Sequence, residues 1–158
     1  MTGILPEKEA RDTVLPFWSF KPANNMVEIE QQTDPRITCA IIEKAALHRA
    51  VTKRFIERMP ELELVWECEF QETAHPFFEQ CIPDILFLQL RHNPVYVVPL
   101  LRPILAYHRG IIVTTGYYLN EIGDLPFPIL AYLQKPFSFE QFMTAIEKYK
   151  RNRTKSHP

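Results

Sequence analysis

Residues 85–88 read Ile-Leu-Phe-Leu, an apolar run without a polar face. A strand of this kind is typical of the centre of a parallel sheet that helices cover on both sides. Further strand-like runs occupy residues 37–42, 62–66, 110–115 and 129–133. The chain from residue 37 onward therefore predicts five strands.

Helical patterns follow the first two strands. The positions at helical spacing after the first strand are Leu47, Ala50, Val51, Arg54 and Phe55. Those that mark the inner face of a helix after the second strand are Ala74, Phe77, Phe78 and Cys81. Pro60 and Pro83 are expected to end these two helices.

Prolines shorten the helical segments later in the chain. The stretch 93–107 has helix-like apolar content but contains Pro94, Pro99 and Pro103, which kink or break a helix. Two more prolines, at positions 126 and 128, leave room for only a short helix before the fifth strand.

The last helix has a clear start. Ser138 and Gln141 have the spacing of a capping box, in which each side chain bonds the backbone N–H of the other residue. The apolar side of this helix is predicted at Phe139, Phe142, Met143, Ile146 and Tyr149.

Strands that alternate with helices predict an α/β fold, a (βα)5 doubly wound sheet of five parallel strands in the flavodoxin-like order 2-1-3-4-5. We expect this domain to span residues 37–151, with a C-terminal tail at 152–158. Residues 1–36 form a proline-rich N-terminal extension that we expect to be partly ordered or docked. Its aromatic cluster at 15–20 leaves two alternatives, a floppy tail or docking on the domain or a second subunit.

Composition excludes several classes of function. A net charge of −1 over 158 residues gives no broad attraction for nucleic acid or anionic lipid. The four glycines form no Gly-x-Gly turn, so dinucleotide fingerprints and P-loops are absent. Three widely spaced cysteines fit neither a disulfide framework nor a thiolate zinc site. Without a signal peptide or an 18-residue apolar run, we expect a soluble cytoplasmic protein.

Functional side chains of such a sheet lie in the loops that follow the strands. Those loops contribute Glu43, Lys44, Gln89, Thr115 and Lys135. Each has a structural alternative: the two charges after the first strand could be solvated, and Gln89 could have no role. Thr115 could serve only as a hydroxyl cap on the turn at Tyr117, and Lys135 could persist because a cis peptide before Pro136 fixes a turn. Asp84, before the third strand, is expected to be structural.

Several motifs in order carry a family resemblance. They are the runs 55–65 (FIERMPELELV), 83–88 (PDILFL), 114–117 (TTGY) and 135–140 (KPFSFE). The chain resembles the receiver domains of two-component response regulators, and is most similar to those of LytTR-type regulators. The resemblance covers roughly residues 37–150.

This resemblance implies a phosphorelay pocket in which five positions carry out phosphoryl transfer. The phosphoacceptor position falls on Gln89, the acidic pair on Glu43 and Lys44, the hydroxyl on Thr115 and the lysine on Lys135. An amide is a feeble nucleophile, and Lys44 brings a cation where a carboxylate should bind Mg²⁺. We therefore expect a degenerate pocket with no metal, no cofactor and no enzymatic activity, and with the Lys44 ammonium close to Glu43.

The resemblance also implies a contact surface on the fourth helix, fifth strand and fifth helix. Here it would carry Tyr117, Tyr118 and Tyr132, a composition typical of interfaces. The leading hypothesis is a pseudo-receiver that acts as a phosphorylation-independent protein-interaction module, as a homodimer or with another signalling protein. It would contact neither nucleic acid nor membrane directly, and we expect no attached DNA-binding domain.

Two alternatives stay open. The protein could be a phosphorelay response regulator that still responds to a kinase, or a small-molecule binder that uses the crevice at the strand carboxyl ends.

Overall fold

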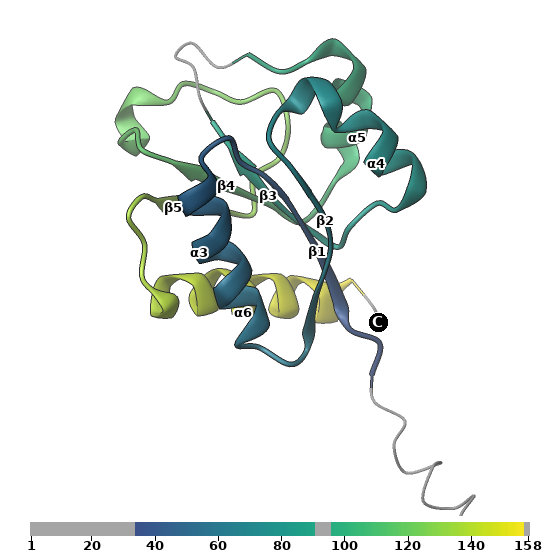
Figure 1. Ribbon diagram of the computed structural model, residues 1–158, viewed down its shortest axis with the longest axis vertical. Coiled ribbons are helices and arrows are strands. Elements are labelled where there is room, and N and C mark those ends of the chain that lie inside the picture. Colours follow the sequence, from purple (N-terminus) through teal and green to yellow (C-terminus); the bar gives the residue numbers. More distant parts are fainter. Residues whose placement is uncertain (1–33, 91–95, 157–158) are drawn as a thin grey trace, which may run out of the picture. The chain divides into compact units, whose positions relative to one another are not determined.

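The computed structural model describes residues 34–90 and 96–156. The chain divides into two compact units, Met1–Pro35 and Arg36–Pro158. The first unit lies almost wholly outside the described residues, and so does the aromatic cluster at 15–20. The described residues belong almost entirely to the second unit (Figure 1).

Five parallel strands form a single sheet in the order β2-β1-β3-β4-β5. The strands are β1 (Ile37–Ile42), β2 (Leu62–Cys68), β3 (Ile85–Gln89), β4 (Ile111–Thr115) and β5 (Ala131–Gln134). The longer helices are α3 (Ala46–Glu57), α4 (His75–Gln80), α5 (Arg102–Tyr107) and α6 (Phe139–Lys155). This order confirms the predicted α/β fold with flavodoxin-like topology.

The two faces of the sheet carry separate cores. Helices α3 and α6 cover one face, and α4 and α5 cover the other (Figure 1). On β3, Ile85 and Phe87 face the first pair of helices, while Leu86 and Leu88 face the second pair. These four side chains are at most 1% exposed, and burying each contributes roughly 1.5–3 kcal/mol. The continuous apolar run is therefore explained by burial on both faces.

Helix α3 forms where the helical spacing predicted a helix, but most of the apolar positions at that spacing are not its buried face. Leu47 is 73% exposed and Val51 is also exposed, whereas Thr52 and Ile56 are buried. Only the C-terminal half of the apolar pattern reaches the core, where Phe55 packs edge-on against other aromatic rings of the α6 region. Thr52 tolerates burial because its hydroxyl donates a hydrogen bond to the His48 carbonyl, at 3.1 Å.

The proline-rich regions form short elements. A 3-10 turn η4 (Pro99–Leu101) leads into α5, and a second 3-10 turn η5 (Leu119–Glu121) lies between β4 and β5. A further turn, η3 (Gln71–Thr73), precedes α4. The predicted start of the third helix falls within residues 91–95, outside the described residues.

Helix α6 begins at the predicted capping box. The N–H of Gln141 donates to the Ser138 hydroxyl at 3.1 Å, and the N–H of Ser138 donates to the Gln141 amide oxygen at 2.8 Å. The helix continues to Lys155, beyond the expected domain boundary at residue 151. No helix within residues 34–90 and 96–156 is long and apolar enough to cross a membrane.

Candidate functional site

The five predicted pocket residues all lie at the carboxyl edge of the sheet. Glu43 and Lys44 follow β1, Gln89 ends β3, Thr115 ends β4, and Lys135 follows β5. Because the strands are parallel, their carboxyl ends meet at the same edge. The hydrogen bonds and ion pair described next connect the five residues.

Glu43 is a buried carboxylate with both oxygens occupied. The side chain is 3% exposed and forms an ion pair with Lys135, whose side chain is 11% exposed. Its Oε1 accepts a hydrogen bond from the Ala45 N–H at 2.9 Å, and His48 Nδ1 lies 4.0 Å from the same oxygen. The charge of Glu43 is thus compensated by a lysine of this chain.

The expected placement of Lys44 is wrong. Its side chain is exposed, and within the described part of the chain its ammonium forms no ion pair with Glu43. The backbone of this loop is held from two sides, because the Lys44 N–H donates to Gln89 and Arg49 donates to the carbonyls of Glu43 at 2.7 Å and Lys44 at 3.2 Å. The lysine that reaches the buried carboxylate is Lys135, from the opposite side of the pocket.

Gln89 has a defined partner. Its amide oxygen accepts a hydrogen bond from the backbone N–H of Lys44 at 2.9 Å. The end of β3 is thereby tied to the loop that follows β1. The alternative that Gln89 has no role is therefore wrong, because its side chain links the end of β3 to this loop.

Thr115 is fully buried, and its hydroxyl is already used. Oγ1 accepts a hydrogen bond from the Tyr117 N–H at 3.0 Å, as the capping alternative predicted. The Thr115 carbonyl accepts from the Lys135 N–H at 2.7 Å, so β4 also positions the paired lysine. The peptide between Lys135 and Pro136 is cis, as expected.

Comparisons with known proteins support a particular fold. No family model matches the chain. The sensory transduction protein LytT of Bacillus cereus is 26% identical over 116 residues, which are 72% of this chain and 47% of that protein. LytT of Bacillus anthracis is 25% identical over a region of the same length. The chain thus spans about half the length of the curated relatives it matches.

Solved structures of response-regulator proteins superpose on this chain. The response regulatory domain of mrkE from Klebsiella pneumoniae superposes with a TM-score of 0.60 at 17% identity, covering 73% of this chain and 96% of that one. The anti-anti-sigma factor PhyR from Bartonella quintana gives 0.59 at 18% identity, covering 87% and 57%. The domain has the receiver fold. The predicted resemblance to response-regulator receivers is therefore confirmed at the level of fold.

The side chains gathered at the carboxyl edge of the sheet do not fit a hard divalent cation. Such a cation needs several oxygen ligands and negative charge. Glu43 is ion-paired with Lys135, the Gln89 oxygen accepts the Lys44 N–H, and Lys44 itself offers an ammonium. Nowhere in residues 34–90 and 96–156 do three His, Cys, Asp or Glu side chains group as metal ligands.

Arg49 is a residue of this site that the sequence analysis missed. It is 16% exposed, and besides the two loop carbonyls it contacts Glu67 through Nε at 3.2 Å and Glu69 through Nη2 at 3.8 Å. A basic residue in the first turn of α3, with two glutamates at the end of β2, is the signal that could have revealed it. Arg49 holds the loop that presents Glu43.

The three predicted interface tyrosines lie along β5 and the segment before it. Tyr132 is 37% exposed and Tyr118 is 64% exposed, while Tyr117 is partly buried. A shallow pocket of about 260 Å³ beside Tyr132 is lined on the α6 side by Lys148 and Arg151. Tyr132 of β5 thus lies beside two basic residues of α6.

Asp84 lies at the opposite edge of the sheet and is structural, as predicted. Its Oδ2 accepts hydrogen bonds from the N–H and hydroxyl of Thr38, at 2.9 and 3.1 Å. The same hydroxyl accepts from the Asp84 N–H at 2.9 Å. These bonds join the starts of β1 and β3.

Proposed function

We propose that this receiver-like domain works without phosphorylation, as a non-enzymatic protein-interaction module of a cytoplasmic signalling system. The observation that carries the proposal is the state of the pocket. Its buried carboxylate is paired with Lys135, and its strand-end oxygen on Gln89 accepts the Lys44 N–H. The polar groups of the pocket are therefore already bonded to other residues of the same pocket.

The chemistry at Gln89 supports this view. Formation of an acyl phosphate needs a carboxylate oxygen as nucleophile, and the amide oxygen of Gln89 is a weak one. The incoming phosphoryl group also carries negative charge that must be offset by a cation. The lysine that could offset it is already paired with Glu43.

A second protein is the partner that the surface favours. Exposed Tyr118 and Tyr132 supply large amphipathic side chains of the type enriched at protein interfaces. PhyR, which shares the fold, is an anti-anti-sigma factor, a designation that describes action on another regulatory protein. We propose that the partner is a signalling protein or a second copy of this chain, bound through η5, β5 and α6.

Treatment with acetyl phosphate and Mg²⁺, followed by intact mass measurement, tests the pocket. We expect no phosphoryl adduct, and no rise in melting temperature with Mg²⁺ and beryllofluoride. A receiver domain that retains its aspartate, treated in parallel, confirms that the reagents are active. A stable adduct on this chain would overturn the proposal.

The interface is tested by sedimentation or by titration with a candidate partner. The variants Tyr118→Ala and Tyr132→Ala should weaken association by about tenfold, the loss expected for an interface aromatic worth at least 1.4 kcal/mol. Tyr107→Ala is the matched control, because Tyr107 on α5 is 86% exposed and belongs to another part of the domain. Equal effects of all three variants would exclude the proposed surface.

A further inference from the structure

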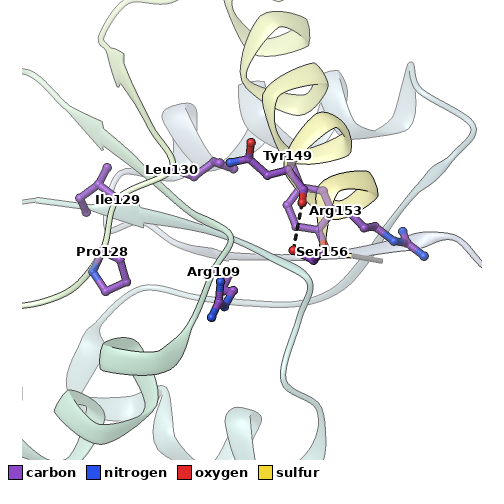
Figure 2. Close-up of a pocket in the computed structure, with 8 residues that line it drawn as sticks. Arg109, Pro128, Ile129, Leu130, Tyr149, Arg153 and Ser156 are labelled. Carbon is purple, nitrogen blue, oxygen red and sulfur yellow. Dashed lines mark hydrogen bonds between the residues drawn. The ribbon is translucent and has the colours of Figure 1, made fainter. Parts of the chain in front are cut away.

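A second pocket lies at the amino edge of the sheet, the edge opposite to Glu43. It has a volume of about 370 Å³ and lies between the C-terminal half of α6 and the residues that precede β5 (Figure 2). Pro128, Ile129 and Leu130 form its apolar wall, and Tyr149 of α6 contributes a ring. Its volume falls in the range of small-ligand sites, roughly 300–1,000 Å³.

The walls of this pocket are held in place. The buried ring of His108 donates from Nε2 to the Pro83 carbonyl at 2.7 Å and accepts the Gly110 N–H at Nδ1, at 3.0 Å. Burial lowers the pKa of His108, so the ring is neutral and Nδ1 can accept. These two bonds anchor the turn that carries Arg109. The Leu130 N–H donates to the Ile111 carbonyl at 2.8 Å, which fixes the apolar wall.

The two charged side chains that line this pocket are both basic, and the Asp84 carboxylate lies behind its Tyr149. Arg109 and Arg153 line it, no carboxylate does, and neither guanidinium forms an ion pair with any residue in the described part of the chain. Lys150, on the same stretch of α6, differs because Glu61 and Glu147 already pair with it. Burial and the nearby Asp84 carboxylate raise the pKa of Tyr149, and its phenol is hydrogen-bonded to Asp84, so Tyr149 offers a ligand its ring and not a free donor. The chain as a whole carries a charge of −1, so this is a local excess.

We propose that this pocket binds a small molecule with a flat apolar body and one anionic group. The body would lie against Ile129, Leu130 and the Tyr149 ring, and the anion would be bound by Arg109. Arg153 extends away from Arg109 in Figure 2, and an exposed arginine changes rotamer within nanoseconds to reach a bound anion. Guanidinium groups bind carboxylate and phosphate through paired N–H donors, so the anion is of that class.

The pocket shares none of its side chains with the Glu43–Lys135 site, so the inference does not depend on the proposed function. The probe is 8-anilinonaphthalene-1-sulfonate, which combines a flat aromatic body with one anionic group and fluoresces when bound. N-phenyl-1-naphthylamine has the same aromatic rings without the anionic group. Inorganic phosphate is an anion without an aromatic body. We expect the sulfonate to bind to the folded full chain, and each partial probe to bind at least about tenfold more weakly.

Variants locate the site. Arg109→Gln combined with Arg153→Gln should weaken binding of the sulfonate by about tenfold or more. Lys148→Gln combined with Arg151→Gln is the matched control, because it also removes two positive charges but from residues that line the other pocket, beside Tyr132. Melting curves of all variants establish that they are folded.

Methyl NMR of the wild-type chain gives a second measurement that needs no variant. Addition of the probe should shift the methyl signals of Ile129 and Leu130 and leave those of Leu47 unchanged. Binding that the double variant does not weaken, tighter binding of the neutral probe, or shifts elsewhere in the chain would each overturn the inference.

Discussion

Glu43 has 3% of its side-chain surface exposed, and a carboxylate in that position must be compensated inside the protein. Lys135 provides the compensation across the pocket, and the Ala45 N–H adds one hydrogen bond. A buried pair of this kind contributes little net stability when intact but is costly to break, because one charge is left without its partner.

We therefore predict that Lys135→Met lowers the free energy of unfolding by roughly 3 kcal/mol. Glu43→Gln should cost less, since the lysine it leaves can move toward solvent. The double variant should cost less than the sum of the two single variants, which urea unfolding would measure as a coupling energy.

Lys53→Met is the control for this series. Lys53 pairs with Glu67 at 2.7 Å, but the two side chains are 40% and 30% exposed, so its loss should cost less than about 1 kcal/mol. If the loss of unfolding free energy in the double variant equals the sum of the losses in the two single variants, Glu43 and Lys135 are not coupled.

His108 makes the stability of the domain depend on pH. Burial lowers its pKa in the folded state below the ordinary value of 6.5. Above pH 6.5 the ring is neutral in both states; as the pH falls below 6.5, the unfolded chain binds a proton before the folded chain does, and stability is lost. The loss ends once the pH passes below the folded-state pKa.

We predict that His108→Gln, which keeps a donor and an acceptor at this position, reduces this pH dependence. The difference in unfolding free energy between wild type and variant should change by at most about 1.4 kcal/mol per pH unit, the slope for one proton. Urea titrations on both sides of pH 6.5 would measure it. A constant difference would mean that His108 is not the titrating group.

At the level of elements, the approach of the start of β4 to the start of β3 depends on a glycine. A Cβ on Gly110 would collide with the backbone carbonyl of Asp84, whereas a Cβ on Gly116 would meet no atom within 4 Å. Gly110, before β4, therefore has no room for a side chain, whereas Gly116, after β4, does.

Gly110→Ala should therefore destabilise the domain by roughly 1–3 kcal/mol, the usual cost of an added group in a packed site. Gly116→Ala should be neutral or slightly stabilising, because it restricts the unfolded chain without a clash. The melting temperatures of the two variants, compared with that of the wild type, test this difference. Similar melting temperatures would mean that the strands can separate at little cost.

On the scale of the whole molecule, the two edges of the sheet have different chemistry. The carboxyl edge has the Glu43–Lys135 ion pair, and the amino edge has a pocket whose two arginines form no ion pair within residues 34–90 and 96–156. The resemblance to receivers places two carboxylate positions of the carboxyl-edge pocket on Gln89 and Lys44, so we expect that one substitution does not restore phosphoryl uptake.

We predict that Gln89→Asp alone is not labelled efficiently by acetyl phosphate in the presence of Mg²⁺. Gln89→Asp combined with Lys44→Asp should be labelled, because Glu43 and two new carboxylates then supply the oxygen ligands that the cation needs. The control is Gln89→Asp combined with Lys53→Asp. It makes the same change in net charge but places the second carboxylate on α3 instead of at position 44, so it should not be labelled. Efficient labelling of the single variant would show that position 44 does not limit the site.

Much of this structure follows from the sequence alone. The apolar run at β3, the capping box at Ser138 and the prolines that shorten η4 and α5 are local signals, because each acts on its own stretch of backbone. The meeting of Glu43, Gln89, Thr115 and Lys135 at one edge also follows, since parallel strands bring their carboxyl ends together.

Only the tertiary structure decides which of these groups make contact. Glu43 and Lys135 are far apart in sequence but form an ion pair because the sheet brings the ends of β1 and β5 to one edge, whereas Lys44, next to Glu43 in sequence, is exposed. The buried face of α3 likewise depends on where the helix crosses the sheet, which the hydrophobic pattern does not specify. The amino-edge pocket forms from three segments that share no motif, because its shape is set by packing between elements.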